Sequence, residues 1–91
     1  MAKTYDQATL GRALGETCQA LRKRAGIAQE DLAYSSGLER SHLSRIERGL
    51  GNPSLETIFR LLPYLNVDFP AFAQEFDARL RKRGGNRRVT G

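Results

Sequence analysis

The sequence predicts an all-α protein built from five short helices. In nearly every segment the apolar residues recur three or four positions apart, which is the period of an amphipathic helix. No stretch alternates apolar and polar residues as a strand does, and the three prolines all lie in the second half of the chain. A chain of 91 residues forms one small domain with a modest core, which favours a helix bundle and leaves little room for an enzyme cleft.

The first helix is expected to end near Arg24, with Gly26 as its stop. Its apolar stripe consists of Leu10, Leu14, Cys18, Leu21 and Ala25. The start is less well marked, because the capping-box pair Thr4 and Gln7 is followed by glycines that weaken the first turns. Since Cys18 lies on the stripe, we expect a small core residue there, and a redox-sensitive thiol is the alternative.

Two short helices are expected next, over residues 29–35 and 40–48. Gly37 lies between them, and glycine adopts the positive φ of a tight interhelix turn without steric cost. The inward side chains are Leu32 and Ala33 on the first helix of the pair and Leu43 and Ile46 on the second. Such a pair is the helix-turn-helix unit, whose second helix can enter a DNA major groove.

The last two helices are expected to follow a loop at residues 50–53. Ser54 is a good N-cap for the fourth helix, and Pro63 should kink its last turn. The buried face of the fourth helix is predicted as Leu55, Ile58, Leu61, Leu62 and Leu65. Asp68 suits the N-cap of the fifth helix, whose apolar face is Phe69, Phe72, Phe76 and Leu80.

The apolar face of the fifth helix is longer than a small core needs. Phe69 and Phe72 are expected to cover the core, whereas Phe76 and Leu80 extend past it. An apolar face that continues beyond the core indicates an interface, so we predict a dimer seam at Phe76 and Leu80. The alternative seam is the N-terminal extension, residues 1–13.

The net charge of +5 belongs to the end of the chain. Residues 79–91 carry six basic residues and no acidic one, whereas residues 1–78 have a net charge of −1. A high isoelectric point therefore does not by itself indicate that the folded body binds DNA. We divide the chain into an N-terminal extension (residues 1–13), a helical domain (residues 14–83) and a basic disordered tail (residues 84–91).

The segment from Gln29 to Gly49 resembles the Cro/phage-repressor helix-turn-helix family, also called the xenobiotic-response-element family. The resemblance covers about residues 14–72. The matching positions are Leu14-Gly15, Arg22, Gly26, Gln29-Glu30-Asp31-Leu32-Ala33, Gly37, Leu43, Ile46-Glu47-Arg48-Gly49, Asn52-Pro53-Ser54-Leu55 and Leu65. The run Gly37-Leu38-Glu39-Arg40-Ser41 is similar to restriction–modification controller proteins within that family. The resemblance implies a compact lambda-repressor-like domain.

The resemblance also implies roles for individual residues. The groove-facing, base-contacting positions correspond to Arg40, Ser41, Ser44 and Arg45, and arginine can make a bidentate contact to guanine. The phosphate-contacting positions correspond to Gln29, Asn52 and Ser54, to which we add His42 and Arg48. Arg22 and Glu47 match a structural ion pair that joins the first and third helices.

Catalysis and metal binding have little support in the sequence. The single histidine, His42, has no Cys or His neighbours at ligand spacing, so we expect a plain helix residue, no metal and no cofactor. No glycine-rich phosphate loop follows a strand, and no polar constellation converges with Cys18.

The chain is therefore predicted to be a transcription regulator, a repressor or controller, that binds a palindromic operator in double-stranded DNA as a homodimer. The alternative is an antitoxin-like protein whose main partner is another protein and whose DNA binding is secondary. A membrane-surface helix at residues 70–83 is a weaker idea, because Glu75 and Asp77 dilute its positive charge. With one cysteine and no leader or long apolar run, the expected location is the cytoplasm, at the nucleoid.

Overall fold

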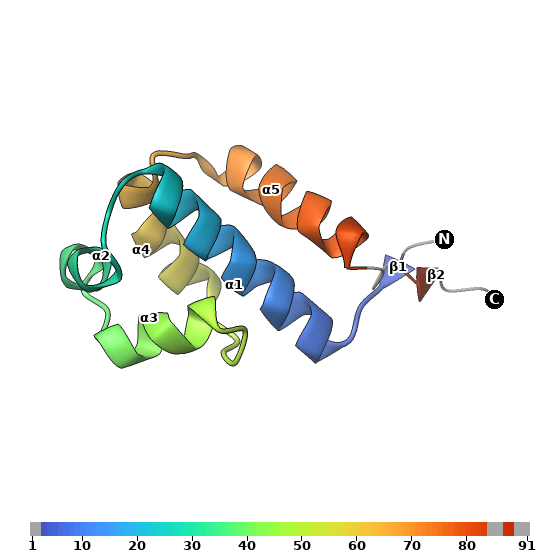
Figure 1. Ribbon diagram of the computed structural model, residues 1–91. Coiled ribbons are helices and arrows are strands. Elements are labelled where there is room, and N and C mark those ends of the chain that lie inside the picture. The colour runs from blue at the N-terminus through green and yellow to red at the C-terminus, as the bar shows by residue number, and fades with distance from the viewer. Residues whose placement is uncertain (1–2, 84–86, 89–91) are drawn as a thin grey trace.

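The computed structural model describes residues 3–83 and 87–88, and within them the predicted five-helix fold is confirmed (Figure 1). The helices are α1 (Gln7–Arg24), α2 (Gln29–Ser36), α3 (Arg40–Glu47), α4 (Leu55–Leu65) and α5 (Phe69–Lys82). One feature was not predicted: β1 (Lys3–Thr4) pairs antiparallel with β2 (Arg87–Arg88). Two-residue strands are too short to produce a recognisable alternation of apolar and polar residues.

Two of the predicted segment boundaries can be compared with these elements. Part of the extension expected over residues 1–13 is helical, because α1 begins at Gln7 and continues past residue 13 without a break. The disordered tail expected over residues 84–91 lies largely outside the described residues. The two positions of that tail which are described, Arg87–Arg88, form β2.

Side-chain caps begin three of the five described helices. The carboxylate of Asp6 accepts a hydrogen bond from the backbone N–H of Thr9 at 2.7 Å, so Asp6, rather than the Thr4 and Gln7 pair, caps α1. Ser54 caps α4 as expected, with 3.1 Å between its hydroxyl and the Thr57 N–H. Asp68 caps α5 as expected, with 3.0 Å to the Ala71 N–H.

The core lies where α1, α3, α4 and α5 meet, with α2 closing one end (Figure 1). Its fully buried apolar side chains include Cys18, Leu21, Leu32, Leu43, Ile46 and Leu61. The predicted stripe of α1 is buried at Cys18 and Leu21, but Leu10 is 38% exposed. The core thus covers the carboxyl half of α1 and leaves its apolar start partly open.

The predicted faces of α4 and α5 need three corrections. Leu55 is 63% exposed and does not belong to the buried face of α4. Phe69 is 39% exposed, and its ring stacks on that of Phe59, so only Phe72 covers the core as expected. Leu80, expected beyond the core, is 6% exposed. The α4 helix continues through Pro63 to Leu65, and its C-cap Asn66 adopts the left-handed conformation.

The α1 helix approaches the carboxyl end of α3 very closely because it has glycine at the contact. A Cβ atom built on Gly15 would lie 2.5 Å from the carbonyl oxygen of Ile46 and 2.7 Å from that of Glu47. A Cβ atom on Gly11 would lie 2.7 Å from the carbonyl oxygen of Gly49. The two glycines that weaken α1 as a helix therefore set its distance from α3.

Candidate nucleic-acid interface

The pair α2 and α3 is joined by a tight turn at Gly37. This glycine has φ 77° and ψ 20°, the left-handed conformation that non-glycine residues rarely adopt. The N–H of Leu38 donates to the carbonyl oxygen of Ala33 at 2.9 Å and closes the turn. Leu32 and Leu43 are completely buried, so the two helices are held together by apolar packing. This turn and this packing fix how α3 projects from the domain.

A buried ion pair joins α1 to the carboxyl end of α3. Arg22 Nε donates to Glu47 Oε2 at 2.7 Å and Arg22 Nη2 donates to Glu47 Oε1 at 3.1 Å, a bidentate arrangement. Arg22 Nη1 also donates to the carbonyl oxygen of Ile27 at 3.0 Å. The structure thus brings together the two residues that the sequence paired, at 11% and 2% side-chain exposure. The pair anchors the base of α3 to the rest of the domain.

Gln29, at the start of α2, joins the same network. Its amide nitrogen Nε2 donates to Glu47 Oε1 at 3.1 Å, and the side chain is half-buried. Sequence reasoning assigned Gln29 to a phosphate and did not foresee this contact. The amide keeps a second N–H and its oxygen for another partner. Gln29 therefore links the start of α2 to the Arg22–Glu47 pair.

Cys18 lies next to this network and is completely buried. Burial, and secondarily the negative charge of Glu47, raises the pKa of its thiol to about 12. A thiol with so high a pKa stays protonated at neutral pH and is a poor nucleophile. Its surroundings match the predicted small core residue and not a redox-sensitive thiol.

The outward face of α3 carries the residues that were assigned to bases. Arg40, Ser41 and Arg45 are exposed and Ser44 is half-buried, while Leu43 and Ile46 point into the core. Arg45 Nη2 donates to the carbonyl oxygen of Leu50 at 3.3 Å, which directs this side chain toward the loop after α3. Polar side chains able to read base edges thus lie along one side of a single helix.

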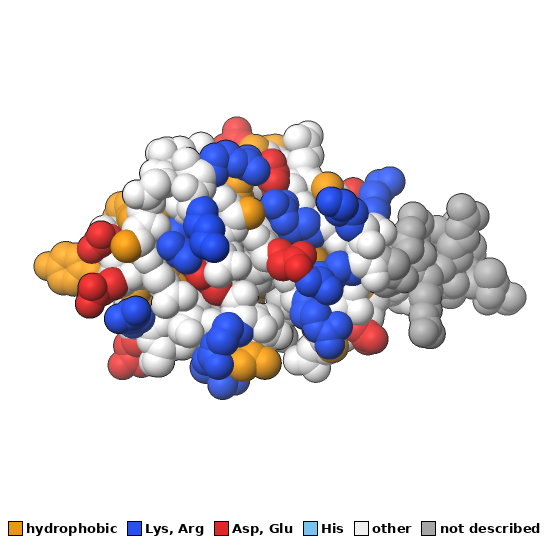
Figure 2. Space-filling model, in the orientation of Figure 1, with side chains coloured by type: hydrophobic (Ala, Val, Ile, Leu, Met, Phe, Trp, Pro, Cys, Tyr) orange, Lys and Arg blue, Asp and Glu red, His pale blue; other side chains and the backbone are white. Residues whose placement is uncertain are grey.

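The residues assigned to phosphates surround this face. His42, Arg48, Asn52 and Ser54 are exposed. Arg48 Nε donates to the carbonyl oxygen of Ser44 at 3.3 Å. The hydroxyl of Ser54 is already the cap of α4, so a phosphate would share it with Thr57. The face in Figure 2 has basic side chains with acidic ones between them, so its charge is mixed.

The predicted dimer seam is only partly supported by its surroundings. Leu80 is buried within its own chain and cannot reach a second copy without opening the domain. Phe76 is half-buried. Sequence reasoning missed the larger exposed apolar patch, which consists of Leu55, Phe59 and Phe69 on α4 and at the start of α5. The rings of Phe59 and Phe69 stack with centroids 5.2 Å apart.

The described residues contain neither a metal-ligand cluster nor a membrane-spanning helix. No group of three or more His, Cys, Asp or Glu side chains there could hold a metal ion. No helix in that part of the chain has the length and apolar character needed to cross a bilayer.

Comparisons with known proteins agree with this geometry. The helix-turn-helix family model matches residues 19–72, more than half of the chain. The immunity repressor protein of Bacillus phage phi105 is 36% identical over 62 residues, which are 68% of this chain and 43% of the repressor. The transcriptional regulator SutR of Escherichia coli is 33% identical over 63 residues, 69% of this chain and 35% of that protein. The chain thus spans well under half the length of these two relatives.

Solved structures give the same result. The wild-type restriction–modification controller protein C.Esp1396I has a TM-score of 0.74 at 29% identity, covering 80% of this chain and 95% of the controller. The structure of the tetramer of that controller in complex with its natural 35 base-pair operator has a TM-score of 0.73 at 28% identity. The match covers 79% of this chain and 95% of the controller chain. With the family match, the ion pair and the turn in place, this chain belongs to the helix-turn-helix family of the Cro and phage-repressor type.

Proposed function

We propose that this protein is a transcription regulator that binds double-stranded DNA sequence-specifically in the cytoplasm. The observation that carries the proposal is the rigid α2–turn–α3 unit with Arg40, Ser41, Ser44 and Arg45 on its outward face. A protruding helix of this size fits the major groove, and arginine and serine side chains contact base edges there. The likeness to a controller protein solved on its operator supports the same interpretation.

The phosphate contacts follow from the same placement. Gln29 and Asn52 lie at the two ends of the α2–α3 unit, in α2 and in the loop before α4. His42, Arg48 and Ser54 are exposed beside them. Contacts to phosphates on both sides of the groove would fix the register of α3 on the duplex without reading sequence.

We propose further that the regulator acts as a homodimer on a palindromic operator. One α3 helix reads only a few base pairs, and a second copy related by a two-fold axis doubles the contacts, with half-sites about one helical turn apart, roughly 34–36 Å. The patch Leu55, Phe59 and Phe69, with Phe76 at its edge, is the apolar surface that supports the seam. It lies on α4 and α5 and leaves α3 free.

Selection of bound duplexes from a random DNA pool tests both parts of the proposal. We expect an enriched inverted repeat whose half-sites are separated by about one turn of DNA. A single, non-repeated motif would contradict the homodimer and leave the DNA-binding regulator. Recovery of no enriched sequence would overturn DNA-binding regulation and favour a module whose main partner is a protein.

A further inference from the structure

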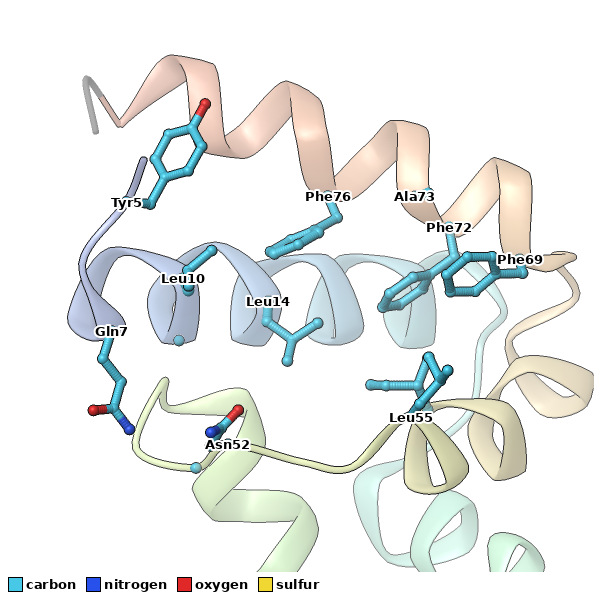
Figure 3. A pocket seen from close by; sticks show the side chains of 13 residues that line it. Tyr5, Gln7, Leu10, Leu14, Asn52, Leu55, Phe69, Phe72, Ala73 and Phe76 are labelled. Atoms are coloured by element: carbon cyan, nitrogen blue, oxygen red, sulfur yellow. The ribbon is translucent and has the colours of Figure 1, made fainter. Parts of the chain in front are cut away.

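An apolar pocket that is open on one side lies apart from the outward face of α3. It has a volume of about 540 Å³ and lies between α1, α5, the start of α4 and the loop that precedes α4 (Figure 3). This volume is within the roughly 300–1,000 Å³ range of small-molecule sites.

The inner part of the pocket is made of apolar and aromatic side chains. Its lining includes Ile58 and Phe72, which are 5% and 3% exposed and belong to the core. Figure 3 shows Leu10 and Leu14 along α1 and the ring of Phe76 from α5 above them. Such walls favour a ligand whose body is an apolar chain or ring system.

The opposite end of the pocket is polar and uncharged. The side-chain amides of Gln7 and Asn52 lie there, near each other and away from the phenylalanine rings (Figure 3). Neither amide makes a hydrogen bond to any other residue that the structure describes. Each can both donate and accept hydrogen bonds. No lining residue carries a charge, so a charged head group would be desolvated without a counter-ion.

We propose that this pocket binds a small amphiphile with an apolar body and an uncharged head, such as an amide or an alcohol. The body lies against Leu14, Phe72 and Phe76, and the head exchanges hydrogen bonds with Gln7 and Asn52. Leu55, Phe69 and Phe76 line the pocket and also belong to the proposed seam, so the ligand and a second copy seated on that seam compete for the same surface.

The position of Asn52 gives such a ligand a regulatory consequence, which rests on the proposed function. Asn52 lies in the loop between α3 and α4 and is also the proposed phosphate contact. When its amide is hydrogen-bonded to the head of the ligand, it is lost to the phosphate. The ligand therefore weakens DNA binding, and by thermodynamic linkage DNA weakens ligand binding by the same factor.

The binding experiment uses the full chain and the neutral fluorescent probe N-phenyl-1-naphthylamine. We expect a saturable rise in probe fluorescence with one site per chain. Ala73 lines the pocket, so the larger side chain in Ala73→Leu should fill it and lower the affinity for the probe at least tenfold. The matched control is Ala78→Leu, an exposed position on the same helix outside the lining, which should bind the probe as the unmodified chain does. If Ala73→Leu does not fold, Ala73→Val adds less volume at the same place.

Three outcomes would overturn the proposal. Unchanged probe affinity in folded Ala73→Leu would place the probe elsewhere. An equal loss of probe affinity in Ala78→Leu would indicate a general effect on the helix. Absence of probe binding at chain concentrations where sedimentation shows a monomer would assign the pocket to the second copy alone.

The regulatory part has its own measurement. Probe affinity is compared with and without a saturating duplex that the protein binds, and we expect it to fall at least tenfold. If probe affinity is unaffected by a bound duplex, the coupling through Asn52 is wrong while the pocket remains a binding site. If no duplex binds at all, the proposed function fails, and the probe titration in the absence of DNA still decides whether the pocket takes a ligand.

Discussion

A single carboxylate, that of Glu47, holds together three parts of the domain. It accepts two hydrogen bonds from Arg22 on α1 and one from Gln29 on α2, and it belongs to α3 itself. Its side chain is 2% exposed, so these donors take the place of the water that would otherwise solvate the carboxylate. The geometry of α3 relative to the phosphate-contacting start of α2 therefore depends on one residue.

Replacing Glu47 with alanine should strongly destabilise the fold. The change leaves the Arg22 guanidinium buried without its partner, a situation that costs roughly 3–5 kcal/mol. Urea unfolding followed by circular dichroism measures the loss. The matched control is Glu56→Ala, which breaks the exposed Arg60–Glu56 pair and should change stability by less than about 1 kcal/mol. Equal effects of the two changes would show that the buried pair is not the anchor.

Replacing Arg40 or Arg45 with alanine should alter which DNA sequence is bound. Each arginine is exposed on α3, and loss of a bidentate base contact costs roughly 1–3 kcal/mol and relaxes preference at one or two base positions. Gln29→Ala should instead weaken binding to all duplexes by the same factor, because a phosphate contact carries no sequence information. Repeating the random-pool selection with each variant separates the two behaviours. If both arginine variants select the original sequence with the original affinity, they do not read bases.

At the scale of the elements, α1 and the carboxyl end of α3 approach each other very closely. Gly15 has no room for a side chain, since a Cβ atom would meet the backbone oxygens of Ile46 and Glu47. Backbone atoms cannot rotate away as the end of a side chain can. The two helices must therefore move apart if α1 acquires a side chain there, and the ion pair at the same end of α3 must move with them.

Gly15→Ala should destabilise the protein although alanine is the better helix former. The gain in helix propensity is about 1 kcal/mol, whereas overpacking costs typically about 1–3 kcal/mol, and here the obstacle is backbone. We expect a lower melting temperature and weaker DNA binding. Gly51→Ala is the control, because its Cβ atom would make only an ordinary contact with Ile46 at 3.6 Å. A Gly15→Ala variant more stable than the unmodified chain would refute the close approach.

The pairing of α5 with the end of α1 should be visible in the titration of Glu75. Hydrogen bonds from Arg79 and then from Arg24 lower the pKa of the Glu75 carboxyl. A lowered pKa in the folded state stabilises the protein above the unfolded pKa, and the contribution is lost as the pH falls through the folded pKa. Since Glu75 is partly exposed, this contribution is small. Arg24→Met, which removes the contact from α1, should raise the Glu75 pKa in a nuclear magnetic resonance titration, and an unchanged pKa would contradict the pairing of the two helices.

The sequence was sufficient for elements whose contacts are local. The inward positions of α2 and α3, the turn at Gly37 and the caps at Ser54 and Asp68 follow from spacing and residue type alone. The burial of Leu80 could not be predicted in this way. The spacing of apolar residues in α5 predicts one apolar face but does not indicate which element covers it. In the structure α1 and α5 pack side by side and antiparallel. Arg83 donates a hydrogen bond to Glu16, and Arg24 donates one to Glu75. Leu80 on α5 lies between Glu75 and Arg83, within the stretch that packs against α1.

For the molecule as a whole, the sequence alone did not predict which apolar surface stays exposed. Leu55 and Phe59 are one helical turn apart on α4, but Phe69 belongs to α5, and only the stacking of the Phe59 and Phe69 rings makes the three residues one patch. The pocket has the same origin, since its lining comes from residues 5–14, 51–58 and 69–76. Non-local arrangements of this kind leave no period in the sequence.

The assembly prediction follows from that patch. Phe59 is 50% exposed, so Phe59→Glu should fold normally and yet place a charge in the seam. We expect a monomer in sedimentation equilibrium and operator binding at least tenfold weaker. Tyr34→Glu, at a position 88% exposed on α2, should leave the dimer intact and serves as the control. A dimer that persists in Phe59→Glu would move the seam to Phe76 or to the N-terminal extension.

The side-by-side packing of α1 and α5 has a consequence for how the chain acquires its fold (Figure 1). Among the described helices, α1 is covered by α5, so the loop that must close is nearly as long as the domain, and closures of that span slow folding. Until residues 69–82 have emerged, the nascent chain keeps an uncovered apolar side that chaperones can recognise. A ribosome-bound chain should therefore be protease-sensitive across α1 while α5 is still inside the ribosome, and should become resistant once residues 69–82 have emerged.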